Sequence, residues 1–203
     1  TGYWQDYVVA APGEGLMGLV KLPAGVSQDK MLSVLGITGL TADFGLLEIG
    51  QPKAGETVLV SGAAGSTGSF VGQIAKIKGC RVVGIAGGPD KCRWLKETAG
   101  FDAVIDYKNE DVHAQIAHHC PNKWDVFFDN VGGPILEAAL DHINLRSRVV
   151  LCGSISGYNA TTPIPGPSNL SNLTINRARM EGLVILDYMP GAVESIQELM
   201  GGV

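Results

Sequence analysis

Short apolar runs rich in valine and isoleucine alternate with longer stretches of mixed polarity over most of this chain. Such runs, bounded by turn-forming residues, are typical of buried strands, and the mixed stretches have the spacing of amphipathic helices. Strands are predicted at 57–61, 81–85, 103–106, 125–129, 148–152 and 183–186, with helices between them at 66–78, 89–98, 111–119 and 135–142. Strands that alternate with helices build a parallel sheet covered on both faces. The sequence therefore predicts a doubly wound α/β domain with a six-stranded parallel sheet.

The first part of the chain follows a different pattern. Apolar residues at 7–9 and 19–22 flank turn-forming residues and predict two short strands. Ser27 is a suitable N-cap for a helix through Leu35, and Thr38 or Thr41 for a second helix through Glu48, ended by Gly50 and Pro52. A last helix is predicted to begin near Ala192.

Composition and charge exclude several classes of protein. The 203 residues are 45% hydrophobic and 17% charged, which is too apolar for a disordered chain. A net charge of −5 without a basic block argues against nucleic-acid binding, and no apolar run is long enough to cross a membrane. The four cysteines and four histidines lack the spacing of zinc motifs. We therefore expect no metal site, and a reducing, cytoplasmic location.

The strongest chemical signal is a glycine-spaced turn after the first predicted strand of the sheet. The segment reads Gly62-Ala63-Ala64-Gly65-Ser66-Thr67-Gly68 and opens a predicted helix. Free N–H groups at the start of a helix, together with the helix dipole, favour an anion such as a pyrophosphate. This context is the one required of a dinucleotide-binding (Rossmann) fingerprint. The alternative is a turn that only connects strand to helix.

The end of the second predicted strand bears on the choice between NAD and NADP. An NAD site usually places an acidic residue there to bind the ribose 2′-hydroxyl. This chain instead has two glycines, followed by Lys91 and Arg93 in the first turn of the next helix. A cation at a helix N-terminus opposes the dipole, which favours a charged partner such as a 2′-phosphate. The alternative is that Asp90 binds the ribose and Lys91 is simply solvated.

Five segments together resemble a known family. They are Gly39-Leu40-Thr41-Ala42, Gly55-Glu56-Thr57-Val58, Gly72-Gln73-Ile74-Ala75-Lys76, Phe128-Asp129-Asn130-Val131-Gly132-Gly133 and Cys152-Gly153-Ser154-Ile155-Ser156-Gly157-Tyr158-Asn159. The chain resembles the zinc-independent medium-chain dehydrogenases/reductases, on the branch of NADP-dependent alkenal/enone double-bond reductases that includes prostaglandin reductases, leukotriene B4 dehydrogenase and curcumin reductases. The resemblance implies a GroES-like catalytic domain beside a Rossmann domain. Residues 1–25 would then be a remnant of the catalytic domain, and residues 26–203 the NADP-binding domain.

The resemblance also implies a set of cofactor-binding residues. These are Gly65, Ser66, Thr67 and Gly68 in the phosphate loop, Lys91 at the 2′-phosphate, Tyr107 at the adenosine, Asn130, the loop of Cys152, Gly153, Ser154, Ile155, Ser156, Gly157 and Tyr158 beside the nicotinamide, and the strand residues Leu183, Val184 and Ile185. Gly88 stands where many members have serine. Simpler roles stay open: Tyr107 as a rim residue, Asn130 as a turn cap, and Cys152 as a small buried side chain.

The resemblance implies NADPH-dependent reduction of the double bond of α,β-unsaturated ketones and aldehydes, with Tyr158 as the catalytic hydrogen-bond donor. Zinc-free quinone reduction, alcohol oxidation and a non-catalytic NADPH-binding module are the alternatives on the same scaffold. The expected partners are NADP(H) and a small enone or enal, without nucleic acid or membrane, and a homodimer is the assembly considered. Because the chain starts at Thr1 and covers only the middle of such an enzyme, we expect these 203 residues alone to be inactive.

Overall fold

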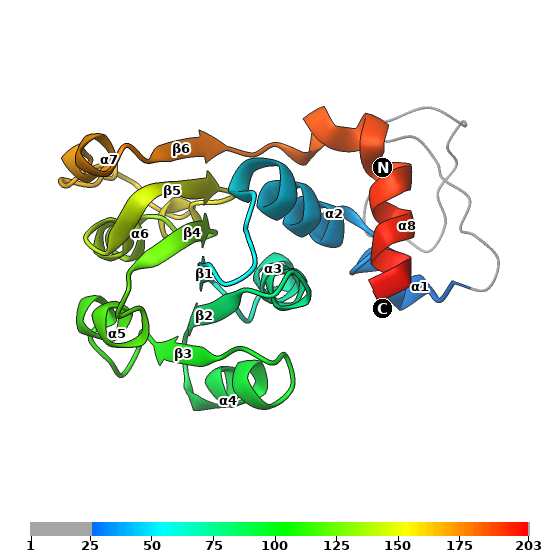
Figure 1. The fold of residues 1–203 in the computed structure, drawn as a ribbon, viewed down its shortest axis with the longest axis horizontal. Coiled ribbons are helices and arrows are strands. Elements are labelled where there is room, and N and C mark those ends of the chain that lie inside the picture. The colour runs from blue at the N-terminus through cyan, green and yellow to red at the C-terminus, as the bar shows by residue number, and fades with distance from the viewer. Residues whose placement is uncertain (1–25, 203) are drawn as a thin grey trace.

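A single parallel sheet organises the computed structural model, which describes residues 26–202. Its strands are β1 (Thr57–Ser61), β2 (Arg81–Ala86), β3 (Ala103–Asp106), β4 (Trp124–Asp129), β5 (Ile143–Leu151) and β6 (Arg179–Gly182). They lie in the order β3-β2-β1-β4-β5-β6, and every neighbouring pair is parallel (Figure 1). The predicted doubly wound, six-stranded sheet is confirmed. The strands expected at 7–9 and 19–22 lie outside the described residues.

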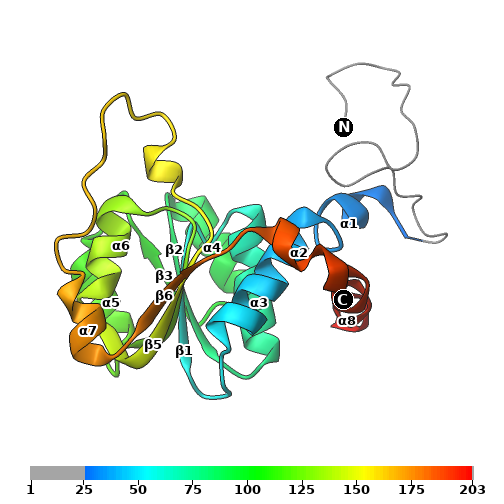
Figure 2. The same ribbon diagram turned by 90° about the horizontal axis from the view of Figure 1, so that it is seen from above.

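Helices cover both faces of this sheet, as Figure 2 shows. The helical elements are α1 (Gln28–Leu32), α2 (Ile37–Phe44), the π-helix η1 (Gly45–Gly50), α3 (Ser66–Ile77), α4 (Pro89–Glu97), α5 (Val112–His119), α6 (Gly133–Leu140), the 3₁₀ turn η2 (Ile155–Gly157), α7 (Ser171–Asn176), the 3₁₀ segment η3 (Ile185–Gly191) and α8 (Ala192–Gly202). Helices α5, α6 and α7 pack on one face, while α2, α3 and α4 pack on the other. In the part of the chain that the structure describes, no helix combines the length and apolarity needed to cross a membrane.

The core is divided by the sheet because side chains alternate along each strand. In β1, Val58 and Val60 pack with the α2 and α3 side, while Leu59 packs with the α5 and α6 side. In β4, Phe128 and Phe127 are both fully buried and lie on opposite faces. Strands buried on both faces read as continuous apolar runs, which is why the sequence located them well.

Gly72 lets helix α3 pack closely on the ring of Phe101, which also lies against Gly84 of β2. A Cβ atom built at this position would come within 2.0 Å of the ring of Phe101. Any larger residue would therefore force the helix or the ring to move. This close packing fixes the helix whose N-terminus carries the glycine turn.

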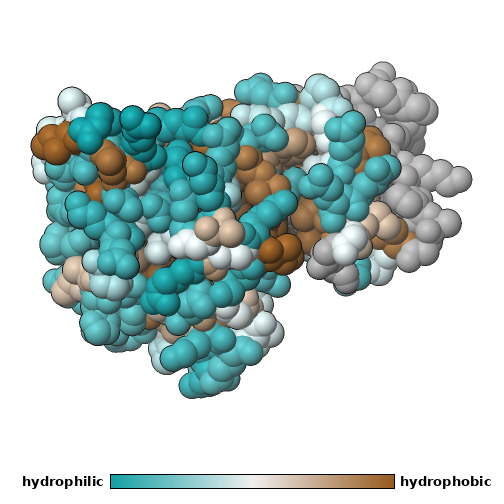
Figure 3. Space-filling model, in the orientation of Figure 1, coloured by the Kyte–Doolittle hydropathy of each residue, from teal (hydrophilic) through white to brown (hydrophobic). Residues whose placement is uncertain are grey.

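Outside the sheet, apolar side chains gather between α3 and α8 (Figure 3). There they line a groove of about 250 Å³ that includes Val34, Leu47, Phe70, Ile74, Ile77 and Leu199. The groove lies on the side of α3 that faces away from the sheet. It is separate from the strand ends, where the candidate site lies.

The sixth strand was predicted in the wrong place. The apolar run 183–186 does not form it; β6 is Arg179–Gly182, and the chain turns into η3 at Ile185. Leu183 still continues the ladder, since its N–H donates to the Leu151 carbonyl at 3.0 Å. An edge strand that is mostly exposed needs no apolar run, so hydrophobicity could not reveal β6.

Other boundaries also differ from the prediction. Strand β5 begins at Ile143 rather than at residue 148, and α6 ends at Leu140 instead of reaching residue 142. The helix predicted to reach residue 48 continues to Gly50 as the π-helix, and α7 was not predicted. The β5 error has a physical cause, because Asn144 to Ser147 leave the regular pairing with β4 and interrupt its apolar pattern.

Candidate functional site at the carboxyl edge of the sheet

The predicted site residues all follow the carboxyl ends of parallel strands, so they lie at the same end of the sheet. The glycine turn follows β1, Lys91 lies beyond β2, and Tyr107 follows β3. Asn130 follows β4, and the loop 152–158 follows β5. The helix after β1 (α3) and the helix after β4 (α6) lie on opposite faces of the sheet. The boundary between β1 and β4 is therefore the switch point of the topology, which is where open α/β sheets bind ligands.

The glycine turn presents free backbone donors at the start of α3. The Gly65 N–H donates to the Gly62 carbonyl at 2.9 Å, which closes the turn. The N–H groups of Ser66, Thr67 and Gly68 have no acceptor among residues 26–202, and Gly68 is buried. A Cβ atom at Gly68 would lie 2.4 Å from the Gly62 carbonyl oxygen, so only glycine fits. The turn is therefore shaped to hold an anion against the helix N-terminus.

The end of β2 contacts the last residue of β3, Asp106, and the residue after it, Tyr107. Asp106 accepts the Gly88 N–H at 2.8 Å, where Gly88 has φ of +97°. Hydrogen bonds from the backbone N–H of Gly88 and the side chain of Asn109 lower the pKa of Asp106. A Cβ at Gly87 would come within 2.7 Å of the Tyr107 ring, so this ring packs directly on the β2 end. Asp106 was missed by the sequence reasoning, although its position at a strand end was a usable signal.

Lys91 is exposed in the first turn of α4, as predicted. The neighbouring Asp90 pairs with Arg93 at 3.3 Å on the surface. Surface pairs of this kind are weak and can rearrange, so Asp90 and Lys91 are both exposed to a ribose or its phosphate.

A buried pair that the sequence reasoning missed joins β1 to β4. Ser61 donates to the Asp129 carboxylate at 2.6 Å, and both side chains are fully buried. Asp129 also accepts the N–H groups of Val131 and Gly132 at 3.0 Å. A buried carboxylate needs such donors, and here they order the turn that begins α6. The signal was present, since a serine and an aspartate end two strands that become neighbours.

Asn130 is held by the same pair. Its Nδ2 donates to the Ser61 carbonyl at 2.7 Å, and its backbone N–H donates to the Ser61 hydroxyl at 2.9 Å. The side chain therefore links the turn after β4 to the end of β1, next to the glycine turn. A turn-stabilising role is thus visible, and a cofactor contact stays a prediction.

The loops after β4 and β5 are joined by backbone hydrogen bonds. The N–H groups of Cys152 and Gly153 both donate to the Asp129 carbonyl, at 2.9 and 3.1 Å. Further along, the Ser156 N–H donates to the Val131 carbonyl at 3.1 Å and its hydroxyl donates to the same oxygen at 2.6 Å. This connection fixes the path of the segment that leads to Tyr158.

Tyr158 is 68% exposed, and its hydroxyl oxygen accepts the Ser154 N–H at 3.2 Å. A Cβ at Gly153 would lie 3.1 Å from the same oxygen, so a small residue there makes room for the ring. The backbone donor uses the oxygen as an acceptor and leaves the phenolic proton available. The tyrosine can therefore donate a hydrogen bond to another group.

Cys152 contributes its backbone here, while its thiol remains neutral. Burial is the main cause that raises the pKa of Cys152 to about 11, and the nearby Asp129 carboxylate adds to the shift. The thiolate is the nucleophilic and metal-binding form, so it is scarce at neutral pH. Among residues 26–202, no three His, Cys, Asp or Glu side chains lie close enough to hold a metal ion.

The segment Leu183, Val184 and Ile185 follows β6 rather than forming a strand. Leu183 is buried against Gly45, whereas Val184 is 57% exposed at the sheet edge. The predicted strand was wrong, although the segment lies at the carboxyl end of β6. Its contact with a cofactor stays a prediction.

The strand order and the glycine turn define a Rossmann-type dinucleotide-binding domain. The sequence model of the zinc-binding dehydrogenase family matches residues 66–200, and the chain belongs to that family.

Relatives narrow the position within the family. The chain is 43% identical over 202 residues to the NADPH-dependent curcumin reductase of Escherichia coli (strain K12), covering 98% of this chain and 58% of that protein. It is 40% identical over 186 residues to the NADP(+)-dependent 2-alkenal reductase of Nicotiana tabacum, covering 91% and 53%. The chain thus spans about half the length of the curated relatives it matches.

A solved structure shows the same arrangement. CurA from Vibrio vulnificus in complex with NADPH matches with a TM-score of 0.84 and 45% identity, covering 91% of this chain and 56% of that one. The resemblance to the alkenal/enone reductase branch of the medium-chain reductases is confirmed by these matches together.

Proposed function

We propose that this chain is the NADP(H)-binding domain of a reductase acting on the carbon–carbon double bond of small α,β-unsaturated ketones and aldehydes. The observation that carries the proposal is the position of Tyr158. Its oxygen is held by the Ser154 N–H at the nicotinamide end proposed for the site, with the phenolic proton free to be donated. The names of the relatives support the same reaction class.

The carboxyl edge fits the cofactor. The unpaired N–H groups of Ser66, Thr67 and Gly68 would bind the pyrophosphate, and Lys91 the 2′-phosphate. Tyr107, packed on Gly87, would border the adenosine, while the loop 152–158 and the segment after β6 would border the nicotinamide. When bound, NADPH supplies the hydride, and the protein supplies position and electrostatics.

The role proposed for Tyr158 follows from where charge develops. Addition of hydride to the β-carbon of an enone places negative charge on the carbonyl oxygen, and a fixed donor stabilises that charge. The hydrogen bond from Ser154 holds the phenol in one orientation before the substrate arrives. A donor that needs no reorganisation is the most effective kind.

We also propose the division of the chain at residue 25, with 1–25 belonging to the catalytic domain and 26–203 to the NADP-binding domain. A homodimer would form at the free edge of β6, because this strand has one neighbour in the described sheet and leaves backbone groups unpaired. Free cysteines at 80, 92, 120 and 152 are consistent with a reducing, cytoplasmic compartment.

Turnover assays test the proposal. The full-length protein would be given NADPH with matched sets of enones, quinones and alcohols, and NADPH oxidation would be followed. We expect reduction of enones and enals, with saturated ketones of the same size inert. Preferential turnover of quinones or alcohols would contradict the reaction class, and NADPH binding without any turnover would indicate a non-catalytic module.

The isolated 203-residue chain provides a separate test of the domain division. We expect it to bind NADPH and to reduce no enone, since most of the substrate-facing domain lies elsewhere. Efficient reduction by this chain alone would contradict the division.

A further inference from the structure

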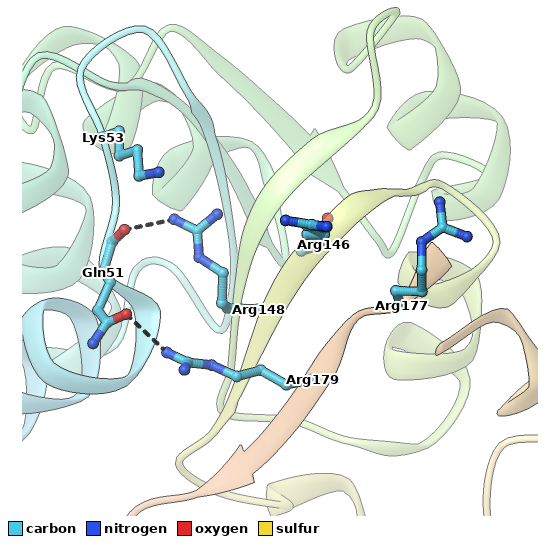
Figure 4. Close-up of a pocket in the computed structure, with 7 residues that line it drawn as sticks. Gln51, Lys53, Arg146, Arg148, Arg177 and Arg179 are labelled. Atoms are coloured by element: carbon cyan, nitrogen blue, oxygen red, sulfur yellow. Dashed lines mark hydrogen bonds between the residues drawn. The ribbon is translucent and has the colours of Figure 1, made fainter. Parts of the chain in front are cut away.

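A second concave site lies at the opposite, amino end of the sheet. Its cavity has a volume of about 330 Å³ and lies between the segment after η1, the start of β5 and the start of β6. The lining residues are Gln51, Lys53, Arg146, Ser147, Arg148, Arg177 and Arg179, six of which are labelled in Figure 4. Five of the seven are cations and none is acidic, in a chain whose net charge is −5.

Two of these cations have structural partners. Arg148 binds the Gly50 carbonyl and Glu56, each at 2.6 Å, and Arg179 binds the Ile49 carbonyl. They neutralise the carbonyl end of the π-helix, as cations at a helix C-terminus commonly do. Their presence is explained by the fold.

The other three cations have no such explanation. Among residues 26–202, Lys53, Arg146 and Arg177 form no ion pair. Within the described residues, the Arg177 side chain donates only to the nearby Ile175 carbonyl, at 3.0 Å. The charge of Lys53 is partly offset by the nearby Glu56 carboxylate, whereas Arg146 and Arg177 have no acidic partner among the described residues. Positive charges around one concavity repel one another, and an anion relieves this repulsion.

The backbone at three of the lining residues also adopts a conformation that is unfavourable in free energy for residues other than glycine. Gln51, Arg146 and Arg177 have φ of +46°, +58° and +49°, and they are three of the four non-glycine residues with positive φ in the described chain. Gln51 and Arg177 are the left-handed C-caps that end η1 and α7, positions where glycine or asparagine is the usual residue. Arg146 also lies on a bulge, because β4 advances from Trp124 to Val126 while β5 advances from Ile143 to Arg148. Bulges often redirect a side chain toward a functional site.

We propose that this cavity is a binding site for a phosphoryl anion that carries two or more negative charges. A monocarboxylate has one charge and would leave the charge of Arg146 or of Arg177 unbalanced. Guanidinium groups arriving from separate segments can each bind a different pair of oxygens on a phosphate or pyrophosphate. The cavity is at the other end of the strands from the nucleotide site, so the inference does not depend on the proposed function.

Calorimetry with inorganic pyrophosphate tests this site. The full-length protein would be titrated at fixed ionic strength and with saturating NADPH, which keeps pyrophosphate from the glycine turn. We expect one pyrophosphate per chain with a dissociation constant below about 1 mM. The double variant Arg146→Gly/Arg177→Gly should weaken binding at least tenfold, while its thermal midpoint without ligand stays equal or rises because glycine suits positive φ.

Lys123→Gly is the matched control, because Lys123 also has positive φ (+67°) but does not line the cavity. It should change neither pyrophosphate binding nor NADPH binding. Absence of saturable binding, equal binding by the double variant, or tighter binding of citrate than of pyrophosphate would each overturn the proposal. A large loss of thermal stability in the double variant would show that the arginines serve the fold, which would also overturn it.

Discussion

The two ends of the sheet are suited to anions by opposite means. At the carboxyl end, the donors are backbone N–H groups from one continuous turn, and glycine at position 68 brings them close to the strand. At the amino end, the donors are long cationic side chains that three separate segments bring around one cavity. The first arrangement is rigid and adds no charge, whereas the second adds charge and depends on side chains that must be held in place.

This difference explains what each end can do. Backbone donors fixed by a helix are preorganised, so binding orders little that was free before. Exposed arginine and lysine side chains lose rotamer freedom when they bind, and their attraction for an anion is weakened by salt. The carboxyl end is therefore suited to holding a cofactor tightly, and the amino end to reversible binding of a soluble anion.

Replacement of Tyr158 by phenylalanine should give the largest effect. If the hydroxyl donates to the substrate oxygen, kcat on enones in the full-length enzyme should fall by roughly 10- to 1000-fold, with nearly unchanged NADPH affinity. Steady-state kinetics and cofactor titration measure the two quantities. Wild-type kcat in the variant would show that the ring only packs at the carboxyl end, and that this end binds without taking part in the chemistry.

At the amino end, removal of Arg148 should be a structural loss. Arg148→Ala deletes bonds to Gly50, Gln51 and Glu56, and its side chain is only 13% exposed, so we expect a loss of about 3 kcal/mol in unfolding free energy. Urea unfolding measures it. Arg146→Ala is the control and should be nearly neutral, because among residues 26–202 Arg146 forms no ion pair.

The Arg148 effect should also depend on pH. Burial raises the pKa of Glu56, but hydrogen bonds from Arg148 and from the Lys53 N–H outweigh burial and lower it below the ordinary 4.5. The pair therefore stabilises the fold above that value, and its contribution is lost as the pH falls through the lowered pKa. The difference between wild type and Arg148→Ala should shrink in acid. A difference that stays constant over the whole acidic range in which both proteins remain folded would contradict this assignment.

Sequence reasoning captured the carboxyl end better than the amino end, for a physical reason. The glycine turn is contiguous and its spacing is set by close backbone approach, so it is visible in one segment. The strands near it are buried on both faces and appear as apolar runs. In contrast, Arg146, Arg177 and Lys53 are far apart in sequence and come together only through the order of the sheet.

At the carboxyl end too, the contacts that the sequence did not reveal are those between segments that become neighbours only in the folded sheet. The Ser61–Asp129 pair depends on β1 and β4 being neighbours, which hydrophobic pattern alone does not give. Likewise, Asp106 reaches Gly88 only because β3 lies beside β2. Such contacts could have been found by asking which strand ends become adjacent in a doubly wound sheet.

A methyl group at the glycine turn should test how rigid the carboxyl end is. Gly68→Ala places a Cβ atom 2.4 Å from the Gly62 carbonyl oxygen, which should cost about 1–3 kcal/mol and weaken NADPH binding at least tenfold. Gly166→Ala is the matched control, since nothing lies within 4 Å of its added Cβ. Wild-type NADPH affinity in Gly68→Ala would mean that the turn can relax.

The smallest expected effect concerns Lys91, the first cation in the sequence after β2. If it binds the 2′-phosphate, NADPH should bind at least tenfold more tightly than NADH, about 1.4 kcal/mol, and Lys91→Ala should remove most of that preference. The effect is limited because Lys91 is exposed and its attraction is screened by salt. Lys96→Ala is the matched control, as it removes the same charge from the last turn of the same helix.

Calorimetry with both cofactors separates the two explanations for Lys91. A lysine that reads the 2′-phosphate affects NADPH alone, whereas a general electrostatic contribution would weaken NADPH and NADH together. Raising the salt concentration should reduce the preference of the wild-type protein for NADPH over NADH. The ratio of the two affinities in Lys91→Ala should hardly change. Equal losses for both cofactors would show that selectivity does not come from this side chain. The carboxyl end would then bind the cofactor phosphates through backbone N–H donors alone, whereas the amino end presents cationic side chains.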